Sequence, residues 1–272
     1  MENIFNLEKK YIIVTGASGL LGKEHCKAIS EFNGIPVLLD TNKETLSNLR
    51  NELESHYSIK VISYICDITN EEDLKAVKKD LESKQIKIYA LINNAARNPK
   101  LEDEDFAKNR LENLSIDDFQ KDLDVGLLGS TLCAKHFGEL IAQNPEGGTI
   151  INISSDLGLI SPDQRIYKKD ALPEYEAVKP VSYSIIKSGI IGLTRYLATY
   201  WIKDNVRCNA ICPGGIENNQ PEEFKRKLNK LIPLARMAKK DEYKSTIIWM
   251  LSTKTTYLNG AIVSVDGGRT AW

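Results

Sequence analysis

A surplus of charge of either sign is almost missing from this sequence. Its 272 residues include 36 lysines and arginines and 37 aspartates and glutamates, which gives a formal net charge of −1. Proteins that bind nucleic acid or anionic membrane surfaces by electrostatic attraction usually carry a clear excess of basic residues. We therefore expect no nucleic acid and no membrane among its partners.

Long apolar runs and clustered metal ligands are also missing. No stretch approaches the roughly 20 apolar residues that a transmembrane helix needs, and Met1–Lys10 lacks the basic-then-apolar layout of a signal peptide. The five cysteines are scattered and odd in number, and the three histidines are isolated, so neither a disulfide framework nor a metal site is predicted. The sequence therefore predicts a cytoplasmic protein with reduced cysteines.

The sequence instead contains short apolar runs that alternate with helical patterns. The predicted strands are Tyr11–Val14, Pro36–Leu39, Lys60–Cys66, Ile88–Ile92, Thr149–Ile153, Val206–Cys212 and Ala261–Val265. Strands and helices that alternate at this spacing favour a parallel, doubly wound sheet with helices on both faces. Because neither a repeat nor a linker interrupts the pattern, residues 1–272 are expected to form a single Rossmann-type α/β domain of about seven strands.

A glycine-rich turn follows the first predicted strand. The segment Thr15–Gly22 has glycines at positions 16, 19 and 22 and leads directly into a helical pattern. Glycines allow a phosphate to approach the backbone, and the free N–H groups at the start of a helix point at it. The turn is a candidate dinucleotide site, although a G-x-x-G-x-x-G spacing also fits a tight strand-to-helix turn that binds nothing.

Polar or glycine residues mark the ends of four predicted strands, at Gly16, Asp40, Asp67 and Asn94. Ligands of doubly wound sheets bind at the carboxyl ends of the strands, so these residues are expected to share one site. Asp40, 18 residues after Gly22, stands where a carboxylate accepts hydrogen bonds from the adenosine ribose and repels a 2′-phosphate. This position predicts NAD(H) in preference to NADP(H). The competing interpretation of Asp40 is a cap for the next helix.

Tyr183 and Lys187 stand four residues apart in a predicted helix. Residues at this spacing share a helix face, so the phenol and the ammonium can point into the same space. A nearby cation favours the phenolate and lowers the pKa of the phenol, which can then act as a general acid or base near neutral pH. The pair predicts a catalytic site, although the same spacing also arises by chance on many helices.

Taken together, these motifs resemble the compact single-domain branch of the short-chain dehydrogenase/reductase family. The matching segments follow the family's order over nearly the whole chain: Thr15–Gly22, Asp67-Ile68, Asn93-Asn94-Ala95, Ile153-Ser154-Ser155, Tyr183-x-x-x-Lys187, Pro213-Gly214 and Val265–Gly268. The resemblance implies an NAD(P)-binding sheet and a Ser-Tyr-Lys site. It implies that Ser155, rather than the competing Ser154, hydrogen-bonds the substrate oxygen and that Tyr183 transfers the proton. Lys187 would lower the tyrosine pKa and bind the nicotinamide ribose.

The same resemblance implies the other contacts with the dinucleotide. The expected cofactor-binding residues are Gly16, Ser18, Gly19, Leu20, Leu21, Gly22, Asp40, Asp67, Ile68, Asn94, Ala95, Ala96, Tyr183, Lys187, Pro213, Gly214 and Ile216. They begin in the glycine-rich turn and end after the sixth predicted strand. The substrate is expected to contact Ser155 and Tyr183 and, from the segment between them, Arg165.

Two features depart from the compact branch. The glycine spacing of the turn is that of the family's extended branch, whereas the Val265–Gly268 ending is typical of the compact one. Gly126 stands where the compact branch usually has an asparagine that helps to hold a water in a proton relay to the lysine. We expect another group, or water in the space that glycine leaves, to serve in that relay.

A third departure is the distance between Ser155 and Tyr183, which are 28 residues apart where the family usually has about half that number. The excess is the segment Leu159–Lys179, which enters the fold beside the reacting groups. A segment of this length without a clear helical or strand pattern is usually functional or disordered. We expect this insertion to lie beside the substrate pocket and to set the substrate.

The insertion itself carries a narrower resemblance. Pro162–Tyr167 resembles a segment of short-chain reductases from bacterial surface-sugar and flagellin-modification gene clusters. This resemblance implies a sugar phosphate, a nucleotide-sugar or a related polyol as substrate. Arg165, Lys168 and Lys169 are candidates to bind its phosphate, and a solvated basic turn is the equal alternative.

The sequence therefore predicts an NAD(H)-dependent oxidoreductase that acts on a hydroxyl or carbonyl carbon of a carbohydrate in surface-glycan biosynthesis. The alternatives are a ketoreductase or alcohol dehydrogenase for an acyl thioester or small alcohol, and a catalytically silent NAD-binding regulator. The helix that carries Tyr183 has more apolar surface than one face needs, at Ile185, Ile186, Ile190, Leu193, Leu197 and Trp201. We therefore expect a homodimer or a homotetramer.

Overall fold

The computed structural model describes residues 3–97, 109–170 and 177–272. Seven parallel strands form one sheet in the order β3-β2-β1-β4-β5-β6-β7. The strands are β1 (Tyr11–Thr15), β2 (Ile35–Asp40), β3 (Ile62–Ile65), β4 (Ile88–Asn93), β5 (Gly148–Ile153), β6 (Val206–Pro213) and β7 (Ile262–Val265). The order reverses between β1 and β4, which is the point where doubly wound sheets bind their ligands.

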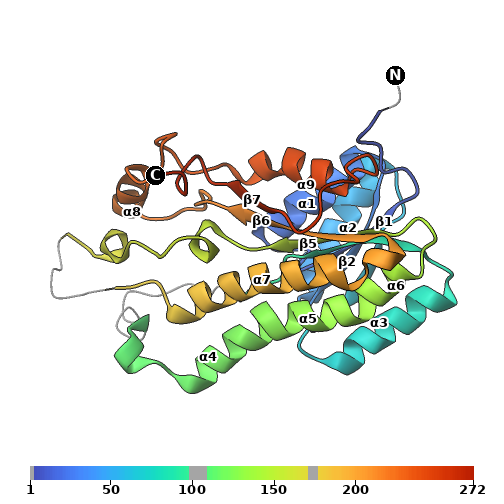
Figure 1. The fold of residues 1–272 in the computed structure, drawn as a ribbon, viewed down its shortest axis with the longest axis horizontal. Helices are drawn as coiled ribbons and strands as arrows, with labels where there is room; N and C mark the ends of the chain where they lie inside the picture. Colours follow the sequence, from blue (N-terminus) through green and yellow to red (C-terminus); the bar gives the residue numbers. More distant parts are fainter. Residues whose placement is uncertain (1–2, 98–108, 171–176) are drawn as a thin grey trace.

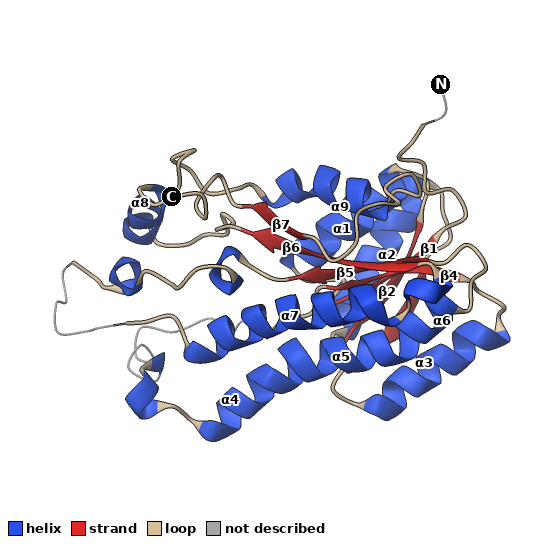
Figure 2. Cartoon of the chain, viewed as in Figure 1, coloured by secondary structure: helices blue, strands red, loops and turns tan. Residues whose placement is uncertain are grey.

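Helices cover both faces of the sheet (Figures 1 and 2). One face carries α1 (Leu20–Glu31), α2 (Lys43–Tyr57) and α9 (Lys244–Leu251), and the other carries α3 (Glu71–Ser83), a long helix over residues 116–142 and α7 (Val181–Tyr200). The long helix consists of α4 (Ile116–Leu123), α5 (Gly129–Cys133) and α6 (Glu139–Ala142), joined by π-helical turns at Asp124–Leu128 and Ala134–Gly138. The short helix α8 (Glu222–Asn229) lies beyond the ends of β6 and β7.

The core is divided between the two faces because side chains alternate along a strand. Ile12 and Val14 of β1 pack with the helices α1, α2 and α9, whereas Ile13 faces the other way and packs with α3, α5 and α7. The strands are therefore apolar on both faces, as parallel strands covered on both sides must be. This double burial explains why each strand stands out in the sequence as a continuous apolar run.

The predicted fold class is confirmed. All seven predicted strands are present, and their ends differ from the prediction by one or two residues. Across the described residues, none of the helices combines the length and the apolar character needed to cross a membrane.

The insertion packs against α8. Its described part contains a short 3₁₀ turn, Gln164–Tyr167, from which Ile166 joins a small apolar cluster with Leu228, Ile232 and Met237. The rings of Tyr167 and Phe224 lie 5.5 Å apart between their centres. Residues 171–176 of the insertion lie outside the described residues. The insertion and α8 thus form one unit at the end of the sheet where the strands finish.

Candidate active site

A cavity of about 620 Å³ opens at the carboxyl ends of the strands. Its lining includes Gly16 after β1, Asp40 at the end of β2, Asn94 after β4, Ser155 after β5 and Pro213 at the end of β6. Of the residues predicted to bind the cofactor, all except Gly22 line this cavity, and so do the three predicted catalytic residues. The structure therefore brings together residues that the sequence spreads over nearly 200 positions.

The glycine-rich turn is shaped by close backbone contacts. Gly16 has a φ of +59°, which favours glycine, and a Cβ placed on it would lie 2.9 Å from the Cα of Ala95. A Cβ on Gly22 would lie 2.2 Å from the carbonyl oxygen of Gly16. Gly22 therefore holds the first turn of α1 against the glycine-rich turn, which explains why it lies behind the cavity.

Asn94 fixes the turn from the neighbouring strand. Its side-chain amide donates to the carbonyl oxygens of Thr15, at 2.9 Å, and Gly16, at 3.1 Å. No side chain caps the start of α1, whose first residue is Leu20. The amide groups at this helix start face the cavity without a competing side chain, which is the arrangement that suits a phosphate.

Asp40 is tied to the same turn. Its Oδ2 atom accepts hydrogen bonds from the backbone N of Ser18, at 2.9 Å, and from its Oγ atom, at 2.7 Å. The cap of α2 is Asn42, whose side chain accepts from the backbone N of Thr45, so Asp40 is not needed as the helix cap. The carboxylate lines the cavity at the end of β2, the position at which a ribose hydroxyl would find an acceptor.

Ser155 and Tyr183 meet at the opposite end of the cavity. The Oγ atom of Ser155 donates to Oδ1 of Asp156, at 2.8 Å, and both Ser155 and Tyr183 line the cavity. Burial raises the pKa of Tyr183 above its ordinary value, and the nearby Ser155 side chain opposes that rise. The competing Ser154 donates its hydroxyl to the carbonyl oxygen of Lys187, at 2.7 Å, which leaves Ser155 as the serine paired with the tyrosine.

Lys187 is buried and donates from Nζ to the carbonyl oxygen of Ile153, at 2.9 Å. The Nζ atom lies 5.8 Å from the centre of the Tyr183 ring. Burial, and to a smaller extent the nearby charge of Lys179, lower the pKa of Lys187 to about 8. The sequence led us to expect that Lys187 would lower the pKa of Tyr183. In this arrangement burial dominates, and the pKa of Tyr183 is raised instead.

Lys179 is a cavity residue that the motifs did not single out. It lies four positions before Tyr183 and directly before Pro180, which caps the start of α7. Its Nζ atom lies 3.9 Å from the centre of the Tyr183 ring, close enough for a cation–π contact. Its position next to the proline that starts the catalytic helix was the one available signal in the sequence.

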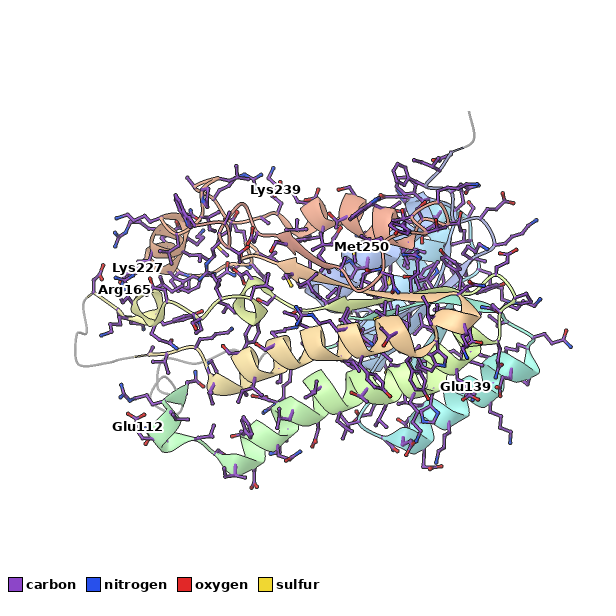
Figure 3. The ribbon with its side chains drawn as sticks, viewed as in Figure 1. Glu112, Glu139, Arg165, Lys227, Lys239 and Met250 are labelled. Atoms are coloured by element: carbon purple, nitrogen blue, oxygen red, sulfur yellow. The ribbon has the colours of Figure 1, made fainter. Side chains whose placement is uncertain are left out.

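Arg165 does not line the cavity. Its side chain is 84% exposed, and its guanidinium binds both carboxylate oxygens of Asp163, at 2.9 and 2.7 Å. Figure 3 shows it at the outer end of the molecule, near Lys227 of α8. The structure thus leaves the predicted phosphate-binding arginine outside the site.

The space beside Gly126 is filled. A Cβ on this residue would lie 2.5 Å from the Cγ2 atom of Ile186. The expectation that the missing side chain leaves room for a relay water is therefore wrong at this position, because α7 packs against the helix there. The glycine allows the two helices to approach closely.

Comparisons with known proteins agree with this geometry. Residues 16–270 match the family model described as enoyl-(acyl carrier protein) reductase. The chain is 30% identical over 262 residues to the post-translational flagellin modification protein A of Campylobacter coli, covering 96% of this chain and 98% of that protein. It is 26% identical to an NADP-dependent mannitol dehydrogenase of Alternaria alternata, covering 98% of this chain and 95% of the other.

A solved structure shares the fold over almost the full length. The short chain dehydrogenase from Leptospira borgpetersenii with bound NAD⁺ superposes with a TM-score of 0.85 and 26% identity, covering 99% of this chain and 96% of that one. The similarity thus extends over the sheet, the glycine-rich turn and the helix that carries Tyr183. The chain belongs to the short-chain dehydrogenase/reductase family and is an oxidoreductase that uses a nicotinamide nucleotide.

Proposed function

We propose that this enzyme acts in the cytoplasm and uses NAD(H) to interconvert a hydroxyl and a carbonyl group on a carbohydrate. The substrate would be a sugar phosphate, a nucleotide-sugar or a related polyol of surface-glycan biosynthesis. The observation that carries the reaction is the meeting of Ser155, Tyr183 and Lys187 in the cavity that also contains Asp40 and the glycine-rich turn. The residues present fit a dinucleotide because the turn leaves its amides uncapped at one end and the reactive side chains stand at the other.

The side chains of this chain would handle the proton and the orientation. Ser155, whose hydroxyl donates to Asp156 in the structure, would turn its one proton to the substrate oxygen and donate a hydrogen bond there instead. In reduction Tyr183 would give its phenolic proton to that oxygen, and in oxidation it would take the proton back. The raised pKa of Tyr183 keeps the phenol protonated at neutral pH, the form that donates. Lys187 would bind the nicotinamide ribose, and the bound nucleotide would supply the hydride chemistry.

The substrate class rests on two observations. One is the relative in flagellin modification, and the other is the mixed polar lining of the reactive end, with Ser155, Lys179, Tyr183 and Lys187. The description of the matching family model favours the alternative, a reductase for acyl thioesters. A screen of sugar phosphates, nucleotide-sugars and a short acyl thioester for NADH production or consumption separates the two. Turnover of none of them would favour a silent NAD-binding regulator.

The preference for NAD(H) should depend on the charge of Asp40. In the wild-type enzyme we expect NADH to bind at least about tenfold more tightly than NADPH, because a 2′-phosphate would face a carboxylate held in place by Ser18. Asp40→Ala and the isosteric Asp40→Asn should both narrow this ratio. The measurement is the pair of dissociation constants by nucleotide fluorescence, and a wild-type ratio in favour of NADPH would remove the assignment.

The enzyme should form a homodimer or a homotetramer through α7 and the long helix beside it. Apolar side chains at Ile185, Tyr196 and Tyr200 on α7 and at Leu128 are between 44% and 61% exposed. Exposed apolar area of this kind is typical of an interface. Light scattering at micromolar concentration measures the mass, and a monomer would refute the proposal. Replacement of Tyr196 and Tyr200 by lysine should shift the assembly toward the monomer.

A further inference from the structure

Two ammonium groups flank Tyr183 at the reactive end of the cavity. The Nζ atom of Lys187 is used within the fold by its hydrogen bond to Ile153. The Nζ atom of Lys179 lies 3.9 Å from the centre of the Tyr183 ring, and Lys179 lines the cavity together with Ser155 and Tyr183. Within residues 3–97, 109–170 and 177–272, its Nζ atom forms no hydrogen bond and no ion pair, and the Tyr183 ring is its cation–π partner. An ammonium in such a position has donors to offer a ligand.

The position of Lys179 is fixed from both sides. Its backbone N donates to Oε1 of Gln164 in the insertion, at 2.8 Å. Pro180 follows it directly and begins α7, the helix that carries Tyr183. The neighbouring Ala177 is buried. The ammonium is therefore placed by the insertion and by the catalytic helix together, which keeps it at the reactive end of the cavity.

The carboxylate of Asp156 forms no ion pair with Lys179, because it is paired with Arg269. Asp156 is buried, and its Oδ1 atom accepts from Ser155 and from the backbone N of Leu157. Its Oδ2 atom accepts from Nη1 of Arg269, at 2.8 Å, in an ion pair whose two side chains are 4% and 6% exposed. Asp156 is therefore already paired with Arg269 and is not a dedicated counter-ion for Lys179.

The remaining carboxylates of the cavity lie at its other end. Asp40 and Asp67 follow β2 and β3, on the far side of β1 from the strand that carries Ser155. The reactive end therefore has two lysines and no free carboxylate among the described lining residues. Burial lowers the pKa of Lys179 to about 8 although Asp156 opposes this shift, so the group is still largely protonated at neutral pH.

A half-buried cation that has no counter-ion among the described residues has lost part of its hydration, and the face of the Tyr183 ring replaces that hydration only in part. An anionic group of the ligand would restore that interaction through charge-assisted hydrogen bonds. We propose that Lys179 binds a carboxylate or phosphate of the substrate, next to the carbon whose oxygen is held by Ser155 and Tyr183. The substrate is thereby an acidic or phosphorylated polyhydroxy compound. The assignment of the reacting oxygen rests on the proposed function, whereas the anion site rests on the geometry of Lys179.

The binding test uses inorganic phosphate and D-gluconate as probes. Each is titrated by calorimetry into enzyme saturated with NAD⁺, so that the glycine-rich turn is already occupied. Lys179→Met, which keeps the length of the side chain and removes its charge, should weaken both probes by about tenfold or more, as expected for a hydrogen bond to a charged group. Lys179→Arg should retain most of the affinity. Lys203→Met, which removes an exposed lysine beyond the end of α7, is the matched control and should change nothing.

A second measurement separates substrate binding from an effect that acts only through Tyr183. D-Gluconate is compared with D-glucitol, which replaces the carboxylate with a neutral CH₂OH group. If the enzyme turns both over, Lys179→Met should lower the ratio of kcat/KM for gluconate to kcat/KM for glucitol by about tenfold or more, because an effect through Tyr183 or Lys187 falls on both compounds and cancels in the ratio. Equal losses for the two compounds would overturn the proposal.

Binding decides the proposal independently of turnover. A wild-type enzyme that binds neither phosphate nor gluconate in the presence of NAD⁺, or a Lys179→Met variant that binds them as well as the wild type, would overturn the anion site. An enzyme that binds these anions through Lys179 and oxidises or reduces none of the screened carbohydrates would instead overturn the proposed function and leave the anion site in place.

Discussion

Replacing Tyr183 with phenylalanine should lower kcat by about 100- to 10,000-fold and leave the dissociation constant of NADH within about twofold of the wild-type value. The change removes the phenolic hydroxyl, which is the group proposed to carry the proton, and keeps the ring. The ring still packs under the ammonium of Lys179, so the shape of the cavity should persist. The loss should therefore fall on proton transfer rather than on binding.

The measurement is the initial rate of NADH production or consumption with the substrate found in the screen. Tyr64→Phe is the matched control, since its hydroxyl bonds Asp80 on α3 and does not line the cavity. That variant should retain normal turnover. A Tyr183→Phe enzyme that worked near the wild-type rate on its true substrate would show that another group carries the proton.

The sequence was sufficient for the sheet because burial on both faces leaves a simple pattern. All residues of β6, Val206–Pro213, are buried, and a run of this kind between polar segments is visible without a structure. The parallel direction of the strands also followed from their alternation with helices, since parallel neighbours need crossover connections. The ends of strands are less sharply encoded, as β3 shows: Lys60, Val61 and Cys66 were predicted to belong to it and lie outside.

The cofactor end of the cavity was also predictable. Its residues directly follow strands, and its glycines stand where the backbone comes too close for a side chain. The substrate end was not. The path of the insertion depends on contacts with residues far along the chain, such as Tyr167 with Phe224 and Asp170 with Arg226. In the resulting path Arg165 lies outside the cavity and Lys179 lines it. Neither position can be predicted from the local sequence pattern.

The close packing at Gly126 also could not be predicted from the sequence. Gly126 and Ile186 are 60 residues apart in the sequence, and their contact is what closes the space that a relay water was expected to fill. The glycine at position 126 showed from the sequence alone that the usual asparagine is missing. Only the packing of α7 against the long helix showed that Ile186 fills the space instead.

The ion pair between Asp156 and Arg269 is the other element that only the fold reveals, because 113 residues separate its two members. Removing one partner of a buried pair leaves an uncompensated charge and costs about 3–5 kcal/mol. Arg269→Leu should therefore lower the free energy of unfolding by about that amount, a large share of the roughly 5–15 kcal/mol that a domain possesses. The variant should also lower turnover, because Arg269 holds the Asp156 carboxylate in place. That carboxylate accepts a hydrogen bond from the Ser155 hydroxyl and orients it.

Urea denaturation measures the stability, and a double-mutant cycle tests the cause. Asp156→Leu combined with Arg269→Leu removes both charges, so most of the lost stability should return, since an apolar pair of similar volume is often no worse than a buried ion pair. Activity should not return with it, because Ser155 then lacks the carboxylate that orients its hydroxyl. If Arg269→Leu alone left the urea midpoint unchanged, the pair would contribute nothing to stability. If the double variant recovered stability and turnover together, Asp156 would have no part in positioning Ser155.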